Sequence, residues 1–258
     1  MNFDSKGRCL ANLTNFPAHK KSRYYFNLDE KINNNINLKE IFENISENIS
    51  TSLTISYDEF EKKIKNIREN LSSREETKNI LNGYGFPFII PKLPSEDIGT
   101  NLQNIFLPAL EKSYRQKFPN YELQNHVKFK LDKKIDLWEN SRYEKVINRS
   151  LESDVVGIFF TCLNEFSFPA AIDIINKLPE NFILSGGYEI ISAIIGKQNI
   201  LMREDKYSPL LWFSSMKNAN DDNLSYHIEP YGYNITFNER AHLNEAAEYW
   251  WHSITYID

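Results

Sequence analysis

The stretch DVVGIFFTCLNEFSFPAAIDIINKLPENFILSGGYEIISAIIG, residues 154–196, decides the predicted fold. The apolar run 155–160 predicts a strand buried on both faces, and 182–184 predicts a second, shorter strand. Between them, a helix is expected to begin at Ser167, a favourable N-cap, and to end before Pro179. The order strand, helix, strand, helix predicts two neighbouring strands that run in the same direction, joined by a right-handed crossover.

Downstream of this unit the pattern changes to short strands separated by turn residues. Strands are expected at 199–202, 210–213, 224–228 and 233–237. A last helix is expected from about Glu239, and the tail 254–257 is expected to add an edge strand. The predicted fold class is therefore α+β: a mixed sheet with a parallel β-α-β unit (about 154–196) and then an antiparallel meander (about 199–237), with helices packed on the sheet.

The N-terminal part of the chain predicts helices. Apolar residues at helical spacing indicate one helix near 38–49 and another near 60–71, with Asp58 as the expected N-cap of the second. The proline-rich segment 84–94 cannot continue a helix and is expected to be extended at an edge. We interpret residues 1–258 as one domain, with 1–94 as a candidate helical subdomain.

Further local signals predict smaller elements. A strand is expected at 127–131, an edge strand at 22–26, and a capping box at Ser141 and Glu144 at the head of a helix. The charged residues 204–206 are interpreted as a solvated turn rather than a nuclease motif.

Composition excludes several classes of protein. The chain has 258 residues, 41% of them hydrophobic, and a formal net charge of -5, which argues against general nucleic-acid binding. It contains no apolar run of the length of about 18 residues that a membrane span needs. Cys9 and Cys162 are far apart and no apolar leader follows Met1, so we expect a cytoplasmic protein without a disulfide framework. The abundance of Asn, Ile and Lys is typical of AT-rich coding sequences and points to a bacterium or a phage.

One candidate site follows from the predicted parallel strands, because ligands bind beyond the carboxyl ends of such strands. The residues expected there are Thr161, Cys162, Asn164 and Glu165 after the first strand, and Ser185, Gly186, Gly187 and Glu189 after the second. They would serve an enzyme or a small-ligand binder. However, their order matches no catalytic motif, and His242 and His252 are too far apart in sequence for a helical zinc pair, so no cofactor and no metal are predicted.

A second candidate site is an aromatic and acidic surface. Its expected members are Trp212, Tyr231, Glu248, Tyr249, Trp250 and Trp251. Aromatic residues with polar tips are enriched at protein interfaces. The acidic residues expected nearby, which would suit a basic partner, are Asp221, Asp222, Glu229, Glu239, Glu245 and Glu248.

These features favour a noncatalytic cytoplasmic protein that binds another protein, as an immunity or toxin-neutralising protein does. The alternative is the enzyme or small-ligand binder described above. Polar side chains of both turns converging in one pocket would favour the alternative, whereas exposure of Trp250 or Trp251 would favour the binding protein.

Overall fold

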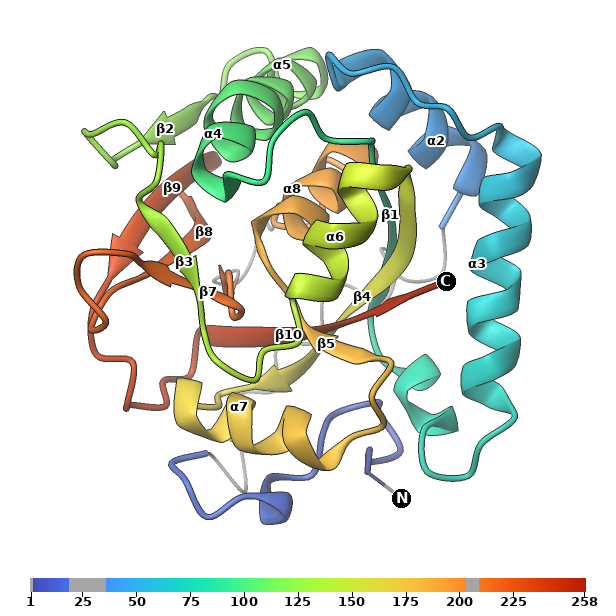
Figure 1. The fold of residues 1–258 in the computed structure, drawn as a ribbon, viewed down its shortest axis with the longest axis vertical. Coiled ribbons are helices and arrows are strands. Elements are labelled where there is room, and N and C mark those ends of the chain that lie inside the picture. Colours follow the sequence, from blue (N-terminus) through green and yellow to red (C-terminus); the bar gives the residue numbers. More distant parts are fainter. Residues whose placement is uncertain (1, 19–35, 203–208) are drawn as a thin grey trace.

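The computed structural model describes residues 2–18, 36–202 and 209–258 (Figure 1). The expected strand at 22–26 and the charged turn at 204–206 lie outside the described residues. The helices are η1 (Ala11–Leu13), α2 (Leu38–Asn48), α3 (Tyr57–Ser72), η2 (Lys78–Asn82), α4 (Ile98–Asn101), the π-helical turn η3 (Leu102–Phe106), α5 (Leu107–Lys117), α6 (Glu144–Glu152), α7 (Phe168–Lys177) and α8 (Gly187–Gly196). The strands are β1 (Gly85–Ile90), β2 (Leu123–Asn125), β3 (Ile135–Leu137), β4 (Val155–Asn164), β5 (Phe182–Leu184), β6 (Leu210–Trp212), β7 (Met216–Asn218), β8 (Ser225–Tyr231), β9 (Asn234–Arg240) and β10 (Trp250–Ile257).

The α+β fold class is confirmed. An eight-stranded mixed sheet has the order β1-β4-β10-β6-β8-β9-β2, with β5 also paired to β10, while β3 and β7 form a separate antiparallel pair. Strands β6, β8 and β9 form the expected antiparallel meander, and the parallel pairs are β6 with β10 and β2 with β9. Helices surround the sheet: α3 flanks β4, α8 packs against β1, and α7 crosses beside β5 and β10 (Figure 1).

The strands β4 and β5 run in the same direction, as expected, but they are not neighbours. Each pairs antiparallel with β10, which lies between them. Ile254 of β10 is opposite Phe160 of β4 on one side and opposite Leu184 of β5 on the other. The crossover through α7 therefore spans one strand, and the expectation of direct adjacency was wrong because the C-terminal segment supplies the intervening strand.

That segment is also where the secondary-structure prediction was wrong. The expected helix after Glu239 is absent: β9 extends to Arg240, turns follow, and 250–257 form the central strand β10 instead of a helix end and an edge strand. Trp, Ile, Thr and Tyr favour strands, and pairing with β4, β5 and β6 satisfies the backbone of β10 on both edges. Residues 199–202 form a turn rather than a strand.

Two smaller predictions were also wrong. Residues 127–131 are irregular, and α6 begins at Glu144 with Tyr143 as an N-cap that makes no side-chain capping bond, so Ser141 forms no capping box. Pro108 directly follows the π-helical turn η3, within a run of helical backbone that continues from α4 into α5, so the helix is irregular next to the proline.

The N-terminal helices belong to the same hydrophobic core as the sheet. Ile45 of α2 and Ile64 of α3 are buried in one contiguous cluster with Ile158 of β4. The proline-rich segment contains β1, an edge strand that is buried along its whole length and pairs antiparallel with β4. Among the described residues, no helix is long and apolar enough to cross a membrane.

The first turn of α3 offers a local test of stability. Ser56, not Asp58 as expected, is the N-cap: its Oγ accepts a hydrogen bond from the Glu59 N–H, and Glu59 Oε2 accepts one from the Ser56 N–H at 2.9 Å. We expect Ser56→Ala to lower the free energy of unfolding by about 1 kcal/mol because this reciprocal cap is lost. Urea titration followed by circular dichroism measures the change. Ser72→Ala, at the exposed end of the same helix, is the control, and an equal loss there would contradict a capping effect.

Candidate functional site

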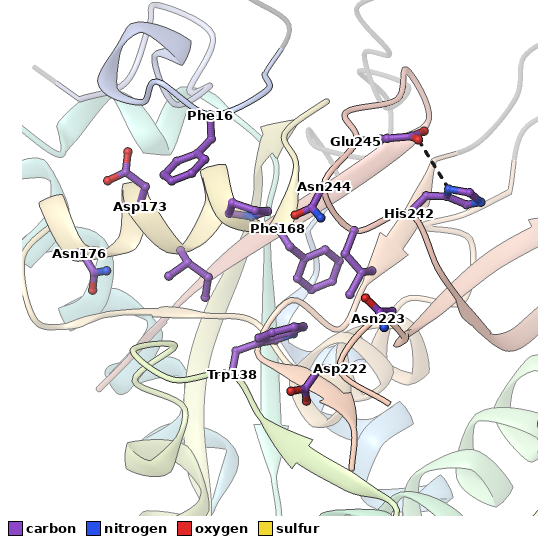
Figure 2. A pocket seen from close by; sticks show the side chains of 13 residues that line it. Phe16, Trp138, Phe168, Asp173, Asn176, Asp222, Asn223, His242, Asn244 and Glu245 are labelled. Carbon is purple, nitrogen blue, oxygen red and sulfur yellow. Dashed lines mark ion pairs between the residues drawn. The ribbon is translucent and has the colours of Figure 1, made fainter. Parts of the chain in front are cut away.

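A pocket of about 560 Å³ opens beside the first turns of α7, next to the carboxyl end of β4 (Figure 2). It lies where the chain leaves β4 and begins α7, and segments far apart in sequence complete it. Its lining residues are Phe16, Trp138, Phe168, Pro169, Ile172, Asp173, Asn176, Asp222, Asn223, His242, Leu243, Asn244 and Glu245. The lining includes none of the eight residues predicted for a ligand site at the carboxyl ends of the parallel strands.

The floor of the pocket is aromatic. The Phe168 ring, only 3% exposed, lies with its centroid 5.9 Å from that of Trp138. Beneath the pocket, Phe168 meets Trp212 edge-on at 5.0 Å and His252 at 4.5 Å, so the floor is backed by fixed rings. Phe16, 50% exposed, adds a ring at the opening. Rigid aromatic side chains offer a large contact area at low cost in conformational entropy.

The rim carries carboxylates. Asp173 of α7, Asp222 and Glu245 all line the pocket, whereas no lysine or arginine within 2–18, 36–202 and 209–258 does so. Burial alone would raise the pKa of Asp173, but hydrogen bonds from Lys177 and Thr14 outweigh it and hold the pKa below its ordinary value. Figure 2 shows Asp173 on the α7 side and Glu245 across the opening. The rim is therefore an environment that favours a positively charged group.

Cations outside the lining contact two of these carboxylates. Lys177 Nζ lies 2.8 Å from Asp173 Oδ2, and Lys217 Nζ lies 2.7 Å from Asp222 Oδ1. Within the rim, His242 Nδ1 lies 3.5 Å from Glu245 Oε1. These pairs are exposed on at least one side, so each is weak and can exchange for a ligand cation.

Backbone hydrogen bonds hold the walls together. The Phe168 N–H donates to the Leu243 carbonyl at 3.0 Å, and the Ser167 N–H donates to the Pro17 carbonyl at 3.0 Å. Glu165, in the turn before α7, and His242, in the opposite wall, both have a positive φ, of 62° and 68°. Such backbone conformations are costly for residues other than glycine and are concentrated at functional sites.

The predicted interface residues separate into buried and exposed members. Trp212 and Trp251 are 0% and 1% exposed and belong to the interior. Tyr231 and Tyr249 are exposed, by 75% and 37%, while Trp250 and Glu248 are partly buried. Neither Trp250 nor Trp251 is a flat exposed ring, so the feature that was expected to favour a binding protein is not observed, and only Tyr231 and Tyr249 of the predicted members are exposed.

Two of these residues nevertheless connect to the pocket. The Trp212 ring contacts Phe168 on one side and meets Trp250 edge-on at 5.5 Å on the other. Trp250 is in turn covered by the Arg240 guanidinium, 5.8 Å from its ring. Trp212 and Trp250 therefore support the floor of the pocket rather than form its surface.

The residues of the other predicted site are all buried. Thr161, Cys162, Asn164 and Glu165 lie in β4 and the turn after it. Ser185 and Gly186 lie between β5 and α8, and Gly187 and Glu189 lie in the first turn of α8. The two groups do not form one pocket, because β10 lies between β4 and β5. The sequence could not reveal this separation, since it gives no sign that the C-terminal segment enters the sheet between β4 and β5.

Glu189 instead organises an internal polar cluster. Its carboxyl group accepts hydrogen bonds from the Gly186 N–H at 2.8 Å, Tyr143 Oη at 2.6 Å and Thr255 Oγ1 at 2.8 Å. Burial raises the pKa of Glu189 to about 7, against the lowering effect of these bonds. The cluster joins α6, α8 and β10, which indicates a structural role.

The Cys162 thiol and the His252 ring are also enclosed. Burial raises the pKa of the Cys162 thiol well above its ordinary value, and burial lowers the pKa of His252 to about 3. The His252 Nδ1 atom pairs with Ser214 Oγ at 3.0 Å. Within 2–18, 36–202 and 209–258, no group of three or more His, Cys, Asp or Glu residues is arranged to hold a metal ion.

Sequence reasoning missed Phe16, Trp138 and Phe168 as site residues, because three separate segments supply these rings. It did identify Asp222 and Glu245 as acidic residues suited to a basic partner, and the structure places both in the rim. Comparison with known proteins adds no family, since no family model, no curated protein and no solved structure matches the chain.

Proposed function

We propose that this is a noncatalytic binding protein that captures a basic segment of a partner protein in the pocket beside α7. The observation that carries the proposal is the combination of an aromatic floor with a rim of three carboxylates, with no lysine or arginine among the described residues of the lining. A side chain with an apolar stem and a cationic end matches both parts, since the stem can pack on Phe168 and the cation can meet Asp173 or Asp222.

The proposal of a noncatalytic role rests on where the reactive groups lie. The Cys162 thiol and the Glu189 carboxyl are buried, and neither lines the pocket. A protein that neutralises or regulates another protein needs a stable contact rather than a reacting group. The pocket supplies a deep anchor point, and exposed Tyr231 and Tyr249 supply further aromatic surface.

The acidic rim is tested by removing its charge without changing its shape. The wild-type chain and the variant Asp173→Asn, Asp222→Asn, Glu245→Gln are used to capture partners from the native lysate, and the purified partner is then titrated by calorimetry. We expect the variant to bind at least about 10-fold more weakly and to lose most of the salt dependence of binding. The control, Glu43→Gln, Glu69→Gln, Glu75→Gln, makes the same charge change on exposed residues that do not line the pocket. Equal binding by both variants would contradict the proposal.

The aromatic part of the pocket is tested at Phe16, its most exposed ring. Phe16→Ala should weaken binding by about 10-fold, because half of the ring is free to contact a ligand. Phe129→Ala is the matched control, since Phe129 is 40% exposed and does not line the pocket. Calorimetric titration of the same purified partner measures both, and a loss in the Phe129 variant as large as in the Phe16 variant would contradict a specific role for the pocket.

A further inference from the structure

The N-terminal segment 2–18 lies against the carboxyl end of β4 at two places. Near its start, the Cys9 N–H donates to the Cys162 carbonyl at 2.9 Å. Near its end, Ala18 forms an antiparallel bridge with Phe166, and Pro17 accepts from the Ser167 N–H. Between these two attachments the segment carries Phe16 to the opening of the pocket. The position of one pocket wall therefore depends on how firmly this segment is held to β4.

The first attachment brings two thiols together. Cys9 and Cys162 are both free cysteines, 5% and 3% exposed, and both belong to the same hydrophobic cluster. The hydrogen bond from the Cys9 N–H to the Cys162 carbonyl places the two backbones in direct contact, as a disulfide requires, since it joins Cα atoms about 4.4 to 6.8 Å apart. The two side chains thus enter the same core from adjacent backbone positions.

We infer that Cys9 and Cys162 form a redox-controlled disulfide that fastens the N-terminal segment to β4. The oxidant is a small-molecule disulfide such as oxidised glutathione. The Cys9 thiol loses its proton, and its sulfur attacks the oxidant and expels one glutathione thiolate; the Cys162 thiolate then attacks the Cys9 sulfur and expels the second. Two electrons pass from the protein thiols to the oxidant, which is reduced to two thiols.

The surroundings of the thiols set the conditions for this reaction. Burial raises the pKa of Cys9 to about 12, and burial together with the nearby Cys9 raises that of Cys162 well above its ordinary value. Few thiolates are present at neutral pH, so the reaction is slow there and accelerates as the pH rises. The cross-link therefore forms under sustained oxidation, and the protein is reduced in an ordinary reducing compartment.

Intact mass measurement tests the inference on the wild-type chain. After incubation with oxidised glutathione at mildly alkaline pH, we expect a monomer lighter by about 2 Da, and a proteolytic peptide joining Cys9 to Cys162. Cys9→Ala and Cys162→Ala should each abolish this loss of mass. The inference is overturned if the folded protein keeps two free thiols, or if glutathione stays attached to Cys9 without closure. The mass measurement does not involve a binding partner, so its outcome is independent of the proposed function.

Thermal unfolding gives a second readout. A cross-link between residues 9 and 162 constrains a long loop in the unfolded chain, so the oxidised form should unfold at a temperature roughly 10 °C higher than the reduced form. A reductant should reverse the shift, and the two alanine variants should show none. A cross-linked form that unfolds at the same or a lower temperature would show that the native geometry does not accommodate the bond.

Discussion

Trp251→Ala is expected to destabilise the protein by about 3 to 5 kcal/mol, because it removes one of the largest fully buried side chains from the central strand. Trp251 is 1% exposed and is paired with Asn164 of β4 on one side and Leu211 of β6 on the other. The cavity left behind would lie on one face of the sheet, and β10 cannot move to fill it because its pairings with β4 and β6 hold it in place. Urea unfolding followed by far-ultraviolet circular dichroism gives the change in free energy.

Trp250→Ala is the matched control for this prediction. The two tryptophans are adjacent in sequence, but Trp250 is only partly buried and packs on Trp212 and Arg240 near the surface. We expect its truncation to cost less than half as much as that of Trp251. Equal losses would contradict the placement of Trp251 in the centre of the sheet.

Glu189 is expected to make the stability of the protein depend on pH. Burial raises its pKa in the folded state to about 7, from an ordinary value of 4.5. Between these two pH values the folded state holds a proton that the unfolded state has lost. The contribution of Glu189 to stability is therefore fully present below pH 4.5 and falls by about 3 kcal/mol as the pH rises to 7.

The variant Glu189→Gln removes this titration while keeping a side chain that can accept hydrogen bonds. We expect the stability of the variant, relative to the wild type, to be about 3 kcal/mol more favourable at pH 8 than at pH 4.5. Comparing the two pH values cancels any constant cost of placing an amide beside Tyr143 and Thr255. A difference between variant and wild type that does not change with pH would show that Glu189 keeps an ordinary pKa.

The pH dependence of stability that His252 contributes is opposite to that of Glu189 over part of this pH range. Burial lowers its pKa from 6.5 to about 3, so its contribution to stability is present above pH 6.5 and is lost as the pH falls. Between pH 4.5 and 6.5 the two slopes are equal and opposite, and we expect them to cancel in the wild type. Glu189→Gln should therefore lose more stability toward acid than the wild type does.

The reverse experiment uses His252→Gln. With the imidazole removed, His252 no longer offsets Glu189, so on lowering the pH from 6.5 to 4.5 the stability of the variant should change more favourably than that of the wild type. His252 packs against Phe168 under the pocket, so the variant is also less stable at every pH, and only the slope is informative. Denaturant titrations at several pH values give the slope of the free energy of unfolding against pH. If both variants change this slope in the same direction from the wild-type value, Glu189 and His252 do not oppose each other.

Local sequence determined most of the elements but not how they meet. Ser167 caps α7, Gly186 and Gly187 begin α8, and β5 lies at 182–184, all as the sequence predicts, because caps, glycine turns and apolar runs act over a few residues. The candidate pocket was much less predictable. The acidic character of Asp222 and Glu245 was readable, but the contribution of Phe16 from the opposite end of the chain was not.

The sequence by itself determined the α+β class, the common direction of β4 and β5 and the helices of the N-terminal part. Only the tertiary structure decided that 250–257 form a strand and that this strand lies between β4 and β5. The apolar residues of the C-terminal segment fit both a helical and a strand pattern, so its local preference was ambiguous. The segment forms a strand because two strand edges are open to it, that of β4 on one side and that of β5 and β6 on the other. These edges supply the backbone hydrogen-bond partners that a buried strand requires.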